Sequence, residues 1–212
     1  MLDAFRDAAR SEHLDVFGML HAQPTDGIGT GTLVLLGPQE PGFWPHLTAS
    51  PEWRDKGADP IDRWSTRVIS KLAEAFSGSA HFPFGTPVRP FMSWAIRSGR
   101  AWSSPVHLLV HDTAGLLVSY RGAVLLPDLH TLPEPAQSPC LGCADRPCVS
   151  ACPAHALTPK DYDLAACHTY LDSSDGQTCM ENGCSVRRSC PISVTYGRME
   201  AQSAFHMERF HR

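Results

Sequence analysis

The sequence predicts an α+β fold in two parts, an α/β domain over residues 1–130 and a smaller cysteine-rich domain over residues 131–212. The first part mixes stretches of helical spacing with apolar runs typical of strands. The second part holds all eight cysteines of the 212-residue chain and is expected to end in a helix. Four prolines between Pro127 and Pro139 predict a linker between the two.

Composition and charge narrow the class of protein. The chain is 42% hydrophobic and 19% charged, which is ordinary for a soluble globular protein. Its net charge of −4 gives no electrostatic argument for binding nucleic acid. The longest strongly apolar run, Leu33 to Leu36, is too short to span a bilayer, and the charged N-terminal segment lacks the apolar centre of a signal peptide. We therefore expect a cytoplasmic protein with neither nucleic acid nor a membrane as a partner.

The first forty residues predict a helix followed by a strand. Apolar residues recur at helical spacing through residues 1–20, which predicts one amphipathic helix. The sequence G-I-G-T-G-T then precedes L-V-L-L-G. Because a strand rather than a helix follows these glycines, we interpret them as a flexible approach to a buried strand and not as a phosphate-binding loop.

The next ninety residues predict three helices and two strands. A short helix is expected from Phe43 to Ala49, and a polar connection over residues 51–60 follows it. Asp59 and Pro60 suit the cap and first turn of a longer helix that ends at Gly78. Residues 87–98 predict a third helix, closed by Gly99. Strands are expected over residues 106–111 and 116–126.

The cysteines form two runs. The first run reads C-L-G-C-A-D-R-P-C-V-S-A-C-P, and the second reads C-M-E-N-G-C-S-V-R-R-S-C-P after an isolated Cys167. Cys152 and Cys190 are each followed by proline, which is typical of two-cluster ferredoxin segments in which that cysteine binds the other run's cluster. Eight cysteines would complete two [4Fe–4S] clusters with none left over.

In this arrangement Cys152, at the end of the first run, binds the cluster of the second run, and Cys190, at the end of the second run, binds the cluster of the first. The eight cysteines then divide into two sets of four ligands. The first set is Cys140, Cys143, Cys148 and Cys190, and the second set is Cys152, Cys167, Cys179 and Cys184. The common run is C-x2-C-x2-C-x3-C-P, whereas this chain has longer gaps before Cys148, Cys184 and Cys190. Structural zinc and a disulfide framework are the alternative interpretations of these spacings. We expect Arg187 and Arg188 to lie in a solvated loop without a specific role. The alternative is that their positive charges neutralise part of the negative charge of a cluster.

Outside the cysteines, the chain resembles two related families of cobalamin proteins. P-V-R-P-F-M-S-W-A-I-R-S-G, L-L-V-S-Y-R-G-A-V-L-L and the cysteine runs follow each other in the order found in epoxyqueuosine reductase. D-P-I-D-R-W and H-D-T-A-G-L-L-V-S-Y-R-G-A-V-L-L-P are similar to the cobalamin-processing CblC (MMACHC) family. Pro83-Phe84-Gly85 stands where epoxyqueuosine reductase has its catalytic aspartate, and the C-terminal repeats of that enzyme are missing. We therefore do not expect tRNA modification.

The resemblance implies a nitroreductase-like (CblC-like) domain joined to a ferredoxin-like module. It further implies that the clusters deliver electrons to a bound corrinoid, reducing cobalamin or removing its upper ligand. By the same resemblance, Arg89, Tyr120 and Arg121 are candidate cofactor-binding residues, and structural salt bridges are the alternative role for the two arginines.

Two functions from different classes stay open at this point. One is a cobalamin reductase or cobalamin-processing oxidoreductase that is supplied by an electron-donor protein. The other is an electron-transfer protein whose N-terminal domain docks a partner and binds no corrinoid. The sequence does not fix a catalytic residue or the oligomeric state.

Overall fold

The computed structural model describes residues 1–211 and has the predicted α+β composition, which confirms the coarse fold class. The chain forms two compact units. Unit 1 comprises Met1–Arg100 and Ser119–Ala136, and unit 2 comprises Ala101–Val118 and Gln137–Arg212. The segment Ala101–Val118, expected in the N-terminal domain, therefore groups with the cysteines. The physical reasons are an apolar core that Val106, Val110 and Leu116 share with residues of the cysteine segment, and hydrogen bonds from Arg187 and to Ser193, described below.

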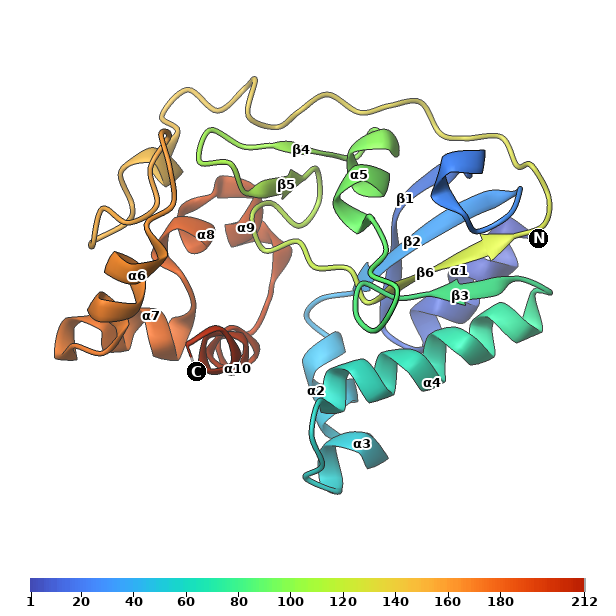
Figure 1. Cartoon of the computed structure of the whole chain (residues 1–212), viewed down its shortest axis with the longest axis horizontal. Helices are drawn as coiled ribbons and strands as arrows, with labels where there is room; N and C mark the ends of the chain where they lie inside the picture. The colour runs from blue at the N-terminus through green and yellow to red at the C-terminus, as the bar shows by residue number, and fades with distance from the viewer. Residues whose placement is uncertain (212) are drawn as a thin grey trace. The chain divides into compact units, whose positions relative to one another are not determined.

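Unit 1 is built on an antiparallel sheet of four strands in the order β1-β2-β6-β3. The strands are β1 (Leu14–His21), β2 (Thr32–Pro38), β3 (Ser79–His81) and β6 (Gly122–Leu126). Every residue of β2 and β6 is buried, because helices cover the sheet on both sides (Figure 1). The predicted strand after the glycine-rich segment is confirmed as β2. The predicted strand over residues 116–126 is present only in its second half.

The prediction of one helix over residues 1–20 is wrong. Helix α1 covers only Leu2–Ser11, and β1 begins at Leu14. His13 has a left-handed backbone with φ of 53°, which stops the helix. The residues after it pair with β2 along their whole length, so sheet formation overrides the local helical spacing.

The helices of unit 1 otherwise follow the sequence closely. They are the 3-10 helix η1 (Pro24–Asp26) and the α-helices α2 (Phe43–Thr48), α3 (Pro51–Arg54), α4 (Pro60–Ala75) and α5 (Phe91–Arg97). The predicted helix beginning at Pro60 is confirmed, but Asp59 makes no side-chain cap and instead has φ of 46°. Figure 1 shows α4 on one side of the sheet and α5 on the other.

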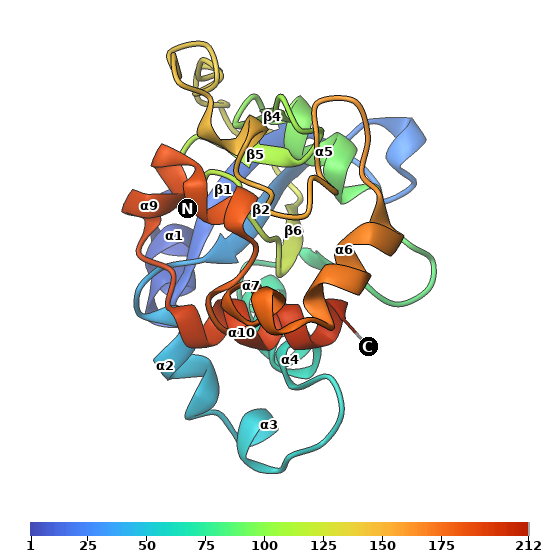
Figure 2. The same ribbon diagram turned by 90° about the vertical axis from the view of Figure 1, so that its left-hand side faces the viewer.

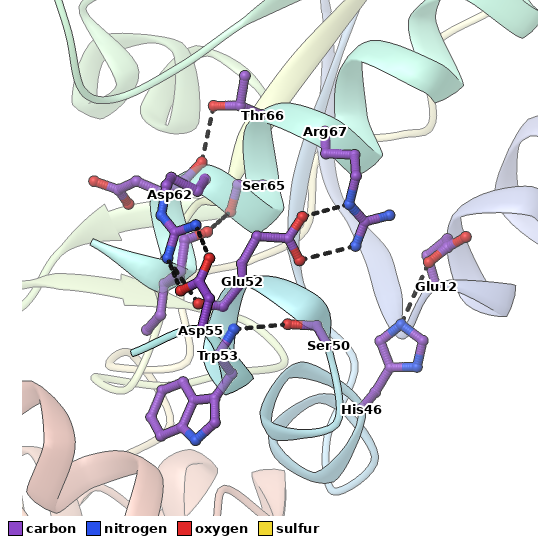
Figure 3. A network of polar contacts seen from close by, with 12 residues as sticks. Glu12, His46, Ser50, Glu52, Trp53, Asp55, Asp62, Ser65, Thr66 and Arg67 are labelled. Atoms are coloured by element: carbon purple, nitrogen blue, oxygen red, sulfur yellow. Dashed lines mark hydrogen bonds and ion pairs between the residues drawn. The ribbon is translucent and has the colours of Figure 1, made fainter. Parts of the chain in front are cut away.

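Ion pairs attach the short helix α3 to α4 (Figure 3). Arg67 donates to both carboxylate oxygens of Glu52, and this guanidinium holds the pKa of Glu52 below its usual value against the opposing effect of burial. Arg63 forms a two-pronged pair with Asp55 at 2.7 Å from each of its terminal nitrogens. These contacts order a segment that the sequence predicts only as a polar connection.

Unit 2 consists of a small hairpin and a series of short helices. The hairpin pairs β4 (Ala101–Ser103) with β5 (Leu109–His111) in antiparallel register. The helices are η2 (Pro147–Val149), α6 (Leu164–Leu171), η3 (Ser174–Gly176), α7 (Gln177–Asn182), α8 (Ser185–Ser189), α9 (Pro191–Tyr196) and α10 (Glu200–Phe210). Helix α10 packs along α7, as Figures 1 and 2 show. Within residues 1–211, none of the helices combines the length and the apolar character needed to cross a bilayer.

Candidate metal centre

Four cysteines of unit 2 line one cavity of about 200 Å³. They are Cys140, Cys143, Cys148 and Cys190, the set that the sequence assigns to the first cluster. Cys148 and Cys190 are buried, at 8% and 9% exposure. The first three come from one short stretch and the fourth from the far end of the second run, so folding joins the two runs at this cavity.

Prolines set the course of the chain on both sides of the cavity. Pro147 is the first residue of η2, which carries Cys148, and Pro191 is the first residue of α9. Proline suits a first helical position because it needs no amide hydrogen there and its φ is already helical. Cys190 itself has an extended backbone between α8 and α9. The proline after it therefore fixes where the chain leaves the cavity.

The segment after β5 forms another wall of the cavity. Gly115 has φ of 58°, and a Cβ at this position would lie 3.1 Å from the Cys190 sulfur. Leu116 lines the cavity, and its amide donates to Ser193 Oγ at 2.9 Å. Arg187 donates to the carbonyl oxygen of Leu116 at 2.6 Å. These bonds fix the segment Ala101–Val118 to the helices that flank Cys190.

The other four cysteines form a second group. Cys167 lies on α6, Cys179 lies on α7, and Cys184 is the residue before α8. Burial raises the pKa of the Cys167 thiol, and the neighbouring thiols of Cys184, Cys152 and Cys179 raise it further. Cys167 and Cys184 pack against the buried Cys179 in one apolar cluster, and these three together with Cys152 are the set assigned by sequence to the second cluster. The ligand role of both sets stays a prediction.

Hydroxyl groups contact two sulfurs of the second group. Tyr162 donates a hydrogen bond to Cys167 Sγ at 3.6 Å, and burial together with this bond raises the pKa of the Tyr162 hydroxyl. Ser185 Oγ lies 3.3 Å from Cys179 Sγ. The second group thus already contains groups that can donate hydrogen bonds to sulfur.

Burial dominates the electrostatics of the first group. It raises the pKa of the Cys140 and Cys148 thiols, and the other thiols of the group add to this effect. Ser138 and the positive charge of Arg146, which also lines the cavity, act in the opposite direction on Cys140. A neutral thiol is therefore favoured until a cationic group displaces its proton, as thiolate coordination requires.

All eight cysteines are free thiols, so the structure gives no support to a disulfide framework. Among residues 1–211, no three His, Cys, Asp or Glu side chains lie close enough together to hold a single metal ion. The four thiols of the first group nevertheless line one common cavity.

The three residues implied for corrinoid binding lie in unit 1. Tyr120 is buried, with its ring centroid 6.1 Å from that of Phe17. The guanidinium of Arg121 lies 4.0 Å from the Asp62 carboxylate, and its side chain is 14% exposed. Arg89 is half-buried and lies near His81, whose pKa is lowered by burial and by this positive charge. Tyr120 and Arg121 thus have packing roles inside unit 1, whatever else they bind.

Several residues of the site are missed by sequence reasoning. Arg187 lies in helix α8 and bonds to Leu116 instead of lying in a solvated loop, and Arg188 donates to the carbonyl of Gly183 at 2.9 Å. Tyr162 could have been found from its position five residues before Cys167. Ser104 and Gly115 carry no local signal, because they reach the cavity only through tertiary structure.

No protein-family model matches the chain, and the searches of curated proteins and of solved structures return no match either.

Proposed function

We propose that unit 2 binds two [4Fe–4S] clusters and that the protein transfers electrons. The observation that carries this proposal is the cavity in which thiols from both cysteine runs meet. Three cysteines of the complementary set, Cys167, Cys179 and Cys184, pack in one apolar cluster, which also supports the proposal. The proposal assigns all eight cysteines a role as thiolate ligands.

Residues of the chain would bind the proposed clusters, surround them with apolar side chains and adjust their reduction potentials. Clusters of this type accept and donate single electrons. Val110, Leu116 and Ile192 give the first cavity an apolar wall. The hydroxyl of Tyr162 and the charge of Arg146 place positive partial or full charge next to sulfur, which stabilises the more negative, reduced state.

We further propose a corrinoid as the electron acceptor, with the electrons arriving from a donor protein in the cytoplasm. Support comes from the sequence resemblance, which also carries the finer assignment of a nitroreductase-like domain and a ferredoxin-like module. The mixed sheet-and-helix composition of unit 1 agrees with the coarser part of that assignment. Of the three implied contact residues, Tyr120 packs in the core and Arg121 faces Asp62, whereas Arg89 is half-buried.

Metal analysis of protein purified without oxygen tests the cluster proposal. We expect about eight irons and about eight acid-labile sulfides per chain, with zinc well below one equivalent. The exposed residue Leu141 lies within the first run, so the variant L141A should retain the full content and serves as the control. Two zinc ions per chain, or metal-free protein after reconstitution with iron and sulfide, would refute the proposal.

Titration with cobalamin tests the acceptor. A corrinoid-binding protein should shift the visible spectrum of cobalamin towards the form that has lost its lower base, and R89A should weaken binding more than the matched exposed variant R54A. Intact clusters without any spectral shift or binding heat would instead support a plain electron carrier.

A further inference from the structure

Arg187 holds its positive charge in a fixed position next to the cysteines. Helix α8 begins directly after Cys184, and the amide of Arg188 donates to the Cys184 carbonyl at 3.0 Å. Arg187 therefore lies in the first turn, three residues after the cysteine, and residues at this spacing share one side of a helix. The guanidinium of Arg187 donates to the carbonyl of Leu116 at 2.6 Å, and the residue is half-buried. This bond keeps the charge beside the helix.

Cys184 lies where the two groups of cysteines adjoin. It packs against the apolar core that contains Cys148 and Cys190 of the first group. It also packs against the apolar core that contains Cys179 of the second group. A charge held on the same helical turn as Cys184 is therefore close to the second group and next to the boundary with the first.

The charge of Arg187 acts on two members of the second group. Burial raises the pKa of the Cys184 thiol, and the amide and the charge of Arg187 oppose this rise. Burial also raises the pKa of the Tyr162 hydroxyl, which donates to Cys167 Sγ, and the charge of Arg187 opposes that rise as well. Cys184 and Tyr162 come from separate segments, so the guanidinium interacts with more than its neighbour on the helix.

We infer that the positive charge of Arg187 raises the reduction potential of the second proposed cluster. The inference rests on the proposed function. Reduction by one electron adds a negative charge to a cluster, and a nearby cation stabilises that state. Because Arg187 is half-buried, salt screens its charge less than it screens an exposed arginine. Arg187 is thus a residue that adjusts the potential through space, and it is not a ligand.

Redox titration followed by electron paramagnetic resonance tests the inference on the full-length, cluster-loaded protein. Lysine and glutamine both keep an N–H group that can donate to a carbonyl, but only lysine is charged. R187K should therefore hold both wild-type potentials, whereas R187Q should make the potential of one cluster more negative. The same shift should persist in the C148S background, where only the second proposed cluster remains.

Arg209 provides the matched control. It is an exposed residue of α10 that pairs with Glu208 at 3.7 Å, so R209Q removes an equal charge from a position that salt screens. R209Q should alter neither potential. If R187Q loses its iron, R187M supplies a second uncharged variant for the comparison with R187K.

The possible failures of the two proposals differ. Full iron content with equal potentials in R187K and in the uncharged variant would overturn the inference alone, as would an equal shift in R209Q. Loss of iron from every Arg187 variant would show that the residue only holds the Leu116 segment, which also overturns the inference. Wild-type protein that binds no iron would overturn the proposed function as well.

Discussion

Gly115 and Cys190 approach so closely that a methyl group on the glycine would lie 3.1 Å from the cysteine sulfur and 2.5 Å from the backbone nitrogen of Ser193. The two residues are far apart in sequence, yet this contact places a turn of the hairpin segment against the last cysteine of the chain. It makes the cavity depend on a residue outside the cysteine runs.

Replacing Gly115 by alanine should therefore disrupt the first of the two proposed clusters and leave the second intact. The added Cβ pushes against the Ser193 backbone, and the left-handed φ of 58° adds strain. We expect iron to fall from about eight to about four per chain. Gly27 is the matched control, because its φ is 63° and no atom lies within 4 Å of a Cβ there. If G27A and G115A lose the same amount of iron, backbone strain alone explains the effect and the contact with Cys190 is irrelevant.

Removing the Tyr162 hydroxyl should lower the reduction potential of the second proposed cluster only. Y162F keeps the ring and deletes the donor to Cys167 Sγ, so the reduced state loses a stabilising bond. Tyr170 is the control, because its hydroxyl donates to the carbonyl of Asp175 at 2.8 Å and not to sulfur. Redox titration of both variants checks the prediction. A shift of equal size in Y170F would contradict it.

The ion pair between Asp26 and Arg97 should stabilise unit 1. Asp26 is 8% exposed and accepts bonds from Arg97 at 2.7 Å and from Trp94 Nε1 at 2.9 Å. We expect D26N to lower the free energy of unfolding by about 2 kcal/mol, less than the ~3–5 kcal/mol of a fully buried pair because Arg97 keeps a quarter of its side chain exposed. Urea denaturation followed by tryptophan fluorescence measures the loss. Asp55 forms a similar ion pair with Arg63, but its side chain is exposed, so D55N should lower the free energy of unfolding much less. An equal decrease in D26N and D55N would refute the claim that burial strengthens the Asp26–Arg97 pair.

The Asp26 carboxylate should also make the free energy of unfolding depend on pH. Burial raises the pKa of Asp26, but bonds from Arg97, the Gln23 amide and Trp94 outweigh it, so the folded-state pKa lies below the usual value of about 3.9. The stabilisation is thus complete above that value and is lost as the pH falls through the folded pKa. Acid denaturation curves should be less steep in D26N. Identical pH profiles in the two proteins would contradict the assignment.

The sequence predicts the parts of this molecule that local patterns determine. The helix beginning at Pro60 follows from a proline start and a regular apolar stripe, and the grouping of Cys190 with the first cysteine run at one cavity follows from the proline after it. Strand β1 is missed because pairing with β2 overrides helical spacing. The cavity wall at Leu116 is missed because it depends on a bond to Ser193, 77 residues away. No local signal predicts contacts across such a separation.

The most direct test of the central claim compares pairs of cysteine variants by their iron content. C148S and C190S belong to the same proposed cluster, so each single variant and the double variant should all retain about four irons. C148S combined with C179S removes a ligand from each proposed cluster, so that double variant should retain almost none. Equal iron in the two double variants would contradict the claim that the cysteines act as two crossed sets of four.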